Sequence, residues 1–209
     1  MRSDRILGCM HRVVSHDLPN QLVAIQGLLQ LFLLEEADRL STDGREYLGR
    51  LQSAAGRAGE LVRFLKELGR VNSHALKVET FALADLLGEV QGLLRQRRTS
   101  WVITCPEVWF VPTIAGDLQV YVQALHELFT GLPNRGEGHA SVQSARADGS
   151  VELTFSLAPE TATRADPATL ERSLELVLAR EWLARCGAHL ILTTPVNHAL
   201  SIVVQIPNP

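Results

Sequence analysis

The sequence predicts an α+β protein in which an N-terminal helical hairpin, residues 1–73, precedes an α/β sandwich, residues 74–209. Apolar residues recur every three or four positions through the first third of the chain, which is typical of helices. From residue 74 onward, short segments of alternating polarity are interspersed with helical segments, which indicates strands and helices in layers. Asp148-Gly149 lies between two of the alternating segments and predicts a β-hairpin.

The first helix is predicted from one apolar stripe whose members are three or four residues apart: Leu7, Met10, Val14, Leu18, Leu22, Ile25, Leu29 and Phe32. Pro19 lies within this pattern and has no N–H to donate to the carbonyl of Ser15. We therefore expect a kink there. A polar break follows and supplies turn and N-cap chemistry through Asp38, Ser41, Thr42, Asp43 and Gly44.

The second helix has an apolar seam with the heptad spacing of a coiled coil: Tyr47, Leu51, Ala54, Ala58, Leu61, Leu65 and Leu68. Two long antiparallel helices cannot bury such wide apolar faces against each other alone. We expect the hairpin to form a homodimer, and thereby a four-helix bundle. Packing of the hairpin against the rest of the chain is the alternative.

The remaining chain predicts short strands under three helices. The helices are expected at 82–96, 117–131 and 167–186, and the short strands at 77–81, 101–104, 109–111, 139–147, 151–157, 190–193 and 201–206. Asp166 is the expected N-cap of the last helix, with Pro167 at its first position and Gly187 at its end.

Composition excludes several classes of function. The 209 residues carry a net charge of −3, which argues against a dedicated nucleic-acid binder. No apolar run is long enough to span a bilayer and the first residues lack a signal peptide, so we expect a cytoplasmic protein without membrane association. Cys9, Cys105 and Cys186 are too few and too scattered for a disulfide framework or a zinc site.

The candidate chemistry lies on the first helix, at His16, Asp17 and Asn20. A neutral imidazole is a nucleophile through one ring nitrogen when the other nitrogen carries the proton. A carboxylate that accepts a hydrogen bond from that second nitrogen fixes the tautomer, and Asp17 is placed to do so. Asn20 is four residues beyond His16, and its amide could orient a water or a phosphoryl oxygen. A histidine in a helix is more often structural, but the neighbouring Asp17 and Asn20 favour a functional role for His16.

Three segments resemble the core of sensor histidine kinases. SHDLPNQLVAIQGLLQLF resembles the phosphoacceptor helix, HELFTGLPNRG resembles the N-box of the ATP-binding domain, and LELVLAREWLARCGAHLILTT with HALSIVVQIP is similar to the end of that domain. The three occur in the order of the family and cover nearly the whole chain. The resemblance implies a dimerisation and phosphoacceptor hairpin followed by an ATP-binding sandwich, with His16 as the phosphoacceptor.

The ATP-binding motifs are degenerate. The N-box asparagine falls on Gly131 and the lysine after it on Asn134, while Ala158-Pro159-Glu160-Thr161 stands where the DxGxG box belongs. The GLGL turn has become Ser173-Leu174-Glu175-Leu176. Mg-ATP needs a hard oxygen ligand for its metal and backbone amides at glycine-rich turns for its phosphates. We therefore expect the domain to bind no ATP, no other cofactor and no metal.

A phosphoacceptor helix without an ATP site predicts a histidine phosphotransfer protein of a two-component phosphorelay. His16 would carry a phosphoryl group between the aspartates of response-regulator receiver domains, with Asp17 as the orienting acid and Asn20 positioning a water or the phosphoryl group. The receiver would supply the Mg²⁺. One alternative is a response-regulator phosphatase that depends on Asn20. Another is a pseudokinase scaffold that pairs with a sensor histidine kinase, and an active kinase is the least favoured.

Overall fold

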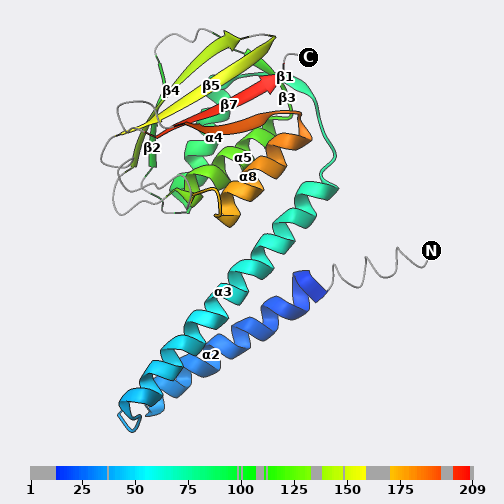
Figure 1. The fold of residues 1–209 in the computed structure, drawn as a ribbon. Helices are drawn as coiled ribbons and strands as arrows, with labels where there is room; N and C mark the ends of the chain where they lie inside the picture. Colours follow the sequence, from blue (N-terminus) through cyan, green and yellow to red (C-terminus); the bar gives the residue numbers. More distant parts are fainter. Residues whose placement is uncertain are drawn as a thin grey trace, which may run out of the picture. The chain divides into compact units, whose positions relative to one another are not determined.

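The structure is a computed structural model. It describes residues 13–36, 38–97, 99, 101–106, 111, 113–132, 138–147, 149–158, 170–193 and 200–207. The chain divides into two compact units, Met1–Ser73 and His74–Pro209 (Figure 1).

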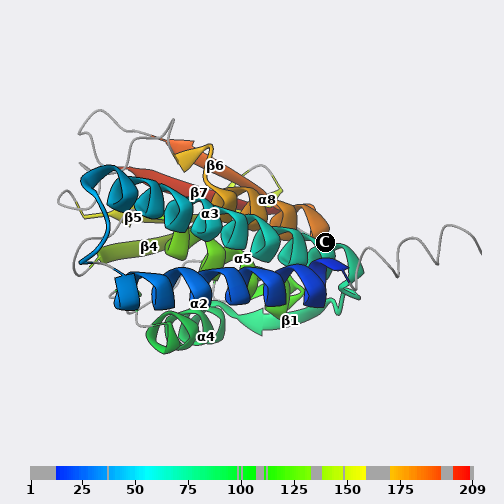
Figure 2. The same ribbon diagram turned by 90° about the horizontal axis from the view of Figure 1, so that it is seen from below.

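The first unit is a helical hairpin. A π-helical turn, η1 (Val13–Asp17), leads into α2 (Leu18–Glu36), and α3 (Thr42–Ser73) returns alongside it (Figure 2). Ser41 Oγ accepts a hydrogen bond from the Gly44 N–H at 3.1 Å, so the predicted capping chemistry of the polar break is confirmed. A kink is expected at Pro19 and stays a prediction; the structure has the π-helical turn η1 just before this residue. Leu7 and Met10 of the predicted stripe lie outside the described residues.

Much of the apolar surface of this hairpin stays exposed. Leu48 and Ala55 of α3 are buried, whereas the heptad seam beside them is open at Tyr47, Leu51, Leu61 and Leu65. In α2 no residue is buried, and Val23, Leu28 and Leu34 are 67%, 66% and 82% exposed. Large exposed apolar patches of this kind mark interaction surfaces.

The second unit is a two-layer α/β sandwich, which confirms the predicted α+β class. In its described part a five-stranded sheet has the order β2 (Trp101–Thr104), β4 (Gly138–Ala147), β5 (Ser150–Leu157), β7 (Ser201–Pro207) and β6 (His189–Thr193). β2 and β4 are parallel and the other neighbours antiparallel. Helices α4 (Leu83–Gln96), α5 (Leu118–Gly131) and α8 (Leu174–Arg185) cover one face (Figure 1). A separate antiparallel pair joins β1 (Glu79–Ala82) to β3 (Thr113–Gly116).

Strand periodicity explains the core between sheet and helices. Side chains of β5 alternate between buried and partly exposed positions, as expected when one face of a sheet is covered. Trp101, Phe129 and Phe155 form an edge-to-face aromatic chain with ring centroids 5.3 and 5.5 Å apart. The predicted hairpin between β4 and β5 is confirmed, and Gly149 in its turn has φ +79°.

Two elements differ from the sequence prediction. The last helix begins at Leu174, later than predicted, because the Ser173 side chain accepts a hydrogen bond from the Leu176 N–H and caps it there. Asp166 and Pro167 lie outside the described residues, and Gly187 follows the helix with φ +69°, as predicted. Of the predicted strand at 109–111, residues 109 and 110 are not described and Val111 is not in a strand. β3 was missed because Thr113–Gly116 is short and becomes a strand by pairing with β1.

Candidate functional site

The predicted site residues lie together at the start of the hairpin. His16 and Asp17 are the last two residues of η1, and Asn20 is in the first turn of α2. All three side chains are exposed. Within the described part of the chain no hydrogen bond joins the His16 imidazole to Asp17, as expected for consecutive helical residues, whose side chains diverge. The imidazole is therefore open to solvent and to a partner protein, and the orienting role of Asp17 stays a prediction.

The helix that follows His16 is uncharged over most of its length. Between Asp17 and Glu35 the sequence contains no Asp, Glu, Lys or Arg. Its exposed surface includes the apolar side chains of Val23 and Leu34. A partner that docks here gains contact with apolar side chains and amides rather than ion pairs.

At Gly131, the position of the N-box asparagine, the second unit has no room for a larger side chain. Gly131 is the last residue of α5, and a Cβ atom built on it would lie 2.6 Å from the Cβ of Glu175 in the first turn of α8. An asparagine cannot fit at that distance without separating the two helices. Glu175 also places a carboxylate at the α8 N-terminus, where a free helix end would attract phosphate.

The neighbouring N-box residues are enclosed. His126 and Glu127 are each 4% exposed, and His126 Nδ1 lies 3.6 Å from Glu127 Oε1. Among the described residues, both imidazole nitrogens and Glu127 Oε2 have no hydrogen-bond partner. The pair is thus buried among the described residues of the second unit.

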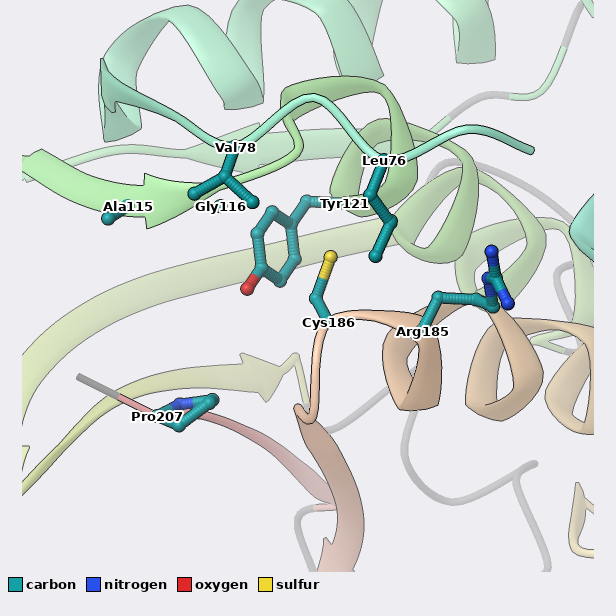
Figure 3. A pocket seen from close by; sticks show the side chains of 8 residues that line it. All are labelled: Leu76, Val78, Ala115, Gly116, Tyr121, Arg185, Cys186 and Pro207. Atoms are coloured by element: carbon teal, nitrogen blue, oxygen red, sulfur yellow. The ribbon is translucent and has the colours of Figure 1, made fainter. Parts of the chain in front are cut away.

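A pocket of about 270 Å³ lies at the other end of α5 and α8 (Figure 3). Tyr121 and Cys186 lie next to each other in it, while Arg185 points away from the Tyr121 hydroxyl. Burial raises the pKa of the Cys186 thiol, so the thiol stays protonated and is a weak nucleophile. The remaining lining is mostly apolar: Leu76, Val78, Ala115, Gly116 and Pro207.

His74 has a role that its sequence context did not indicate. It is half-buried in the loop after α3, with its Nε2 3.0 Å from Asp117 Oδ2. Asp117 also accepts hydrogen bonds from the N–H groups of Lys77 at 2.7 Å and Val120 at 3.2 Å. Burial by itself would raise the pKa of Asp117, but these hydrogen bonds outweigh it and the pKa is lowered. His74 and Asp117 are 43 residues apart, so no local pattern could have paired them.

The described residues contain neither a metal-ligand cluster nor a membrane-spanning helix. No three His, Cys, Asp or Glu side chains among them lie close enough together to hold a metal ion. None of the helices that they form is long and apolar enough to cross a membrane.

Comparison with known proteins finds likeness in structure and not in sequence. No protein-family model matches the chain, and no curated protein matches it. The histidine kinase AdeS of Acinetobacter baumannii superposes with a TM-score of 0.61 at 14% identity, over 92% of this chain and 97% of that one. Full-length ShkA, solved in complex with AMPPNP, gives 0.57 at 18% identity, over 95% and 45% of the two chains.

A third structure is that of the histidine kinase ThkA in complex with the response regulator protein TrrA. It superposes with a TM-score of 0.56 at 18% identity, over 100% of this chain and 64% of that one. At such low identities the likeness shows the fold and leaves the chemistry open. The chain has the fold of a sensor histidine kinase core, a helical hairpin followed by an ATP-binding-type α/β sandwich.

Proposed function

We propose that the protein is a histidine phosphotransfer protein of two-component signalling that does not use ATP. One contrast carries the proposal: the His16 imidazole is exposed on the hairpin, whereas Gly131 and Glu175 close the second unit at the N-box position. A kinase needs both an acceptor histidine and a bound nucleotide. A phosphotransfer protein needs only the histidine, because its partner brings the phosphoryl group.

The proposed reaction is a reversible transfer between an aspartyl phosphate and His16. The unprotonated ring nitrogen attacks phosphorus, a P–N bond forms, and the P–O bond to the receiver's aspartate breaks. The electron pair of the broken bond leaves with the aspartate carboxylate. The proton on the other ring nitrogen remains, so the ring becomes a phosphorylated imidazolium, and Asp17 favours that positive charge. The reverse reaction delivers the group to the aspartate of a second receiver.

The partners in this proposal are receiver domains and a second copy of the chain. A receiver would bring both the aspartate and the Mg²⁺, so a metal site in this chain is not required. The complex of ThkA with a response regulator supports a receiver as partner of this fold. The exposed seam at Tyr47, Leu51, Leu61 and Leu65 supports a homodimer, because a four-helix bundle would cover it.

The test is transfer of radiolabel from phosphorylated receiver domains to the purified chain. We expect label in an acid-labile, base-stable linkage that disappears in His16→Ala. The matched control is His189→Ala, which removes an exposed histidine of the second unit and should leave the label unchanged. Asp17→Asn should slow transfer roughly 10²-fold without ending it, because it removes the charge that favours the imidazolium.

The same variants separate the alternatives. Asn20→Ala should leave transfer between receivers intact and slow only hydrolysis. A phosphatase would show the reverse pattern, with Asn20 required and His16 replaceable. A scaffold would be insensitive to either substitution as long as the dimer persists. Transfer at the wild-type rate in His16→Ala would refute the proposal.

A further inference from the structure

The turn that carries His16 is one residue wider than a turn of α-helix. In η1 (Val13–Asp17) the backbone follows a π-helical path, in which each carbonyl pairs five residues ahead instead of four. The α-helical path resumes at Leu18, and Pro19 is the next residue. Isolated π-helical turns are rare and concentrate at functional sites.

The apolar stripe contains one surplus residue at this place. Met10, Val14, Leu18 and Leu22 are separated by three successive steps of four. These steps cover twelve residues, where three turns of α-helix need about eleven. On an uninterrupted α-helix, Val14 and Leu22 would point about 80° apart. In the structure both are half-buried and η1 still contacts α3, so the wide turn takes up the surplus residue and keeps Val14 and Leu22 on the same side of the helix.

Pro19 explains why the wide turn lies here. Its nitrogen carries no hydrogen, so the Ser15 carbonyl has no donor four residues ahead and the α-helical ladder cannot run through this point. The surplus residue could otherwise be taken up elsewhere along α2, or the stripe could slip off α3. Resting on the proposed function, we propose that Pro19 is a positioning residue: it localises the π-helical turn at Val13–Asp17, and that turn sets the direction in which His16 faces.

The direction matters because a receiver must approach His16 while docked on the hairpin. One residue of α-helix corresponds to a rotation of about 100°. If the turn relaxes to α-helix, side chains before Leu18 rotate by up to that amount relative to α2. The imidazole stays exposed, but the line from its nitrogen to the phosphorus of a docked receiver changes. Misplacement of reacting groups by about 1 Å can slow a reaction roughly 10²-fold.

The test compares Pro19→Ala with Gly27→Ala. Both changes put alanine in place of a poor helix former in α2, and a Cβ at Gly27 meets no atom within 4 Å. Transfer from a phosphorylated receiver is measured over a range of receiver concentrations, so that kcat and KM are separated. Labelling by phosphoramidate, a small donor that needs no docking, is measured in parallel. Amide hydrogen exchange at residues 15–20 reports whether the π-helical turn persists.

For Pro19→Ala we expect kcat for the receiver to fall roughly 10–100-fold, with KM and the phosphoramidate rate within about twofold of wild type. Exchange at residues 15–20 should slow as the α-helical ladder closes. Gly27→Ala should leave both rates unchanged. An unchanged kcat in Pro19→Ala, or an equal fall with both donors, would overturn the positioning role while the proposed function stands. Retention of label in His16→Ala would instead overturn the proposed function.

Discussion

Adding a single methyl group at Gly131 should destabilise the second unit. In an open helical position, Gly→Ala stabilises a protein by up to about 1 kcal/mol, because alanine loses less backbone entropy on folding. At Gly131 the new Cβ would lie 2.6 Å from the Cβ and 3.4 Å from the Cγ of Glu175. A Cβ is fixed to the backbone, so the clash is relieved only if α5 and α8 move apart.

The expected magnitude follows from the packing. Forcing an extra carbon into a well-packed interface typically costs about 1–3 kcal/mol, which exceeds the gain from helix propensity. For Gly131→Ala we expect a net loss of about 1–2 kcal/mol in the free energy of unfolding. With a urea dependence near 2 kcal/mol per M, the midpoint should fall by roughly 0.5–1 M. Gly131→Asn, which restores the N-box residue, should be at least as destabilising.

The assay is urea unfolding followed by tryptophan fluorescence. All three tryptophans lie in the second unit, and Trp101 and Trp182 are buried, so the signal reports that unit. The matched control is Gly88→Ala in α4, where a new Cβ meets no atom within 4 Å and stability should rise by up to about 1 kcal/mol. A Gly131→Ala protein as stable as wild type would refute the close packing of α5 on α8, and with it the argument that this position is closed.

Three further predictions concern nucleotide binding, assembly and pH. Calorimetry with Mg-ATP should show no saturable heat at concentrations below about 1 mM, where a dissociation constant of 1 mM corresponds to a binding free energy of about −4 kcal/mol. Binding in the micromolar range would instead support the active kinase. Light scattering should find that the wild-type protein is a dimer and that the double variant Leu51→Glu, Leu65→Glu is a monomer. Two unpaired charges buried in the seam would cost several kcal/mol. A wild-type protein that is monomeric at micromolar concentration would contradict the role of the seam in dimerisation. Asp117→Asn should lower the stability of the second unit by about 1–3 kcal/mol near neutral pH. Because the folded pKa of Asp117 is lowered, the wild-type advantage should begin to shrink as the pH falls below about 4 and should vanish only below the folded pKa, as measured by unfolding at several pH values.

Local patterns in the sequence predicted most of the elements. The β4–β5 hairpin, the three helices of the sandwich and the capped start of α3 all depend on periodicity and turn residues within one short segment. The misplaced start of α8 had a local signal too, because Ser173 precedes the helix with N-cap chemistry. β3 had none, since its strand character comes from pairing with β1, about thirty residues earlier in the chain.

The candidate site was likewise predicted from the sequence only in part. His16, Asp17 and Asn20 stood out in the sequence because a nucleophile, an acid and an amide occur within five residues. The π-helical turn beneath them did not, because it depends on how the stripe fits against α3. The contact between Gly131 and Glu175 and the network of His74 with Asp117 join residues more than forty positions apart.

By itself, then, the sequence determined the order of the elements, the α+β class and the residues that can do chemistry. These follow from hydrophobic periodicity, capping and functional groups, which are properties of neighbouring residues. The tertiary structure alone decided that the N-box position is closed, that the heptad seam faces outward beside buried Leu48 and Ala55, and that His16 lies on a wide turn. Each of these is a matter of contact between segments remote in the chain, where a separation of 1 Å decides whether a side chain fits.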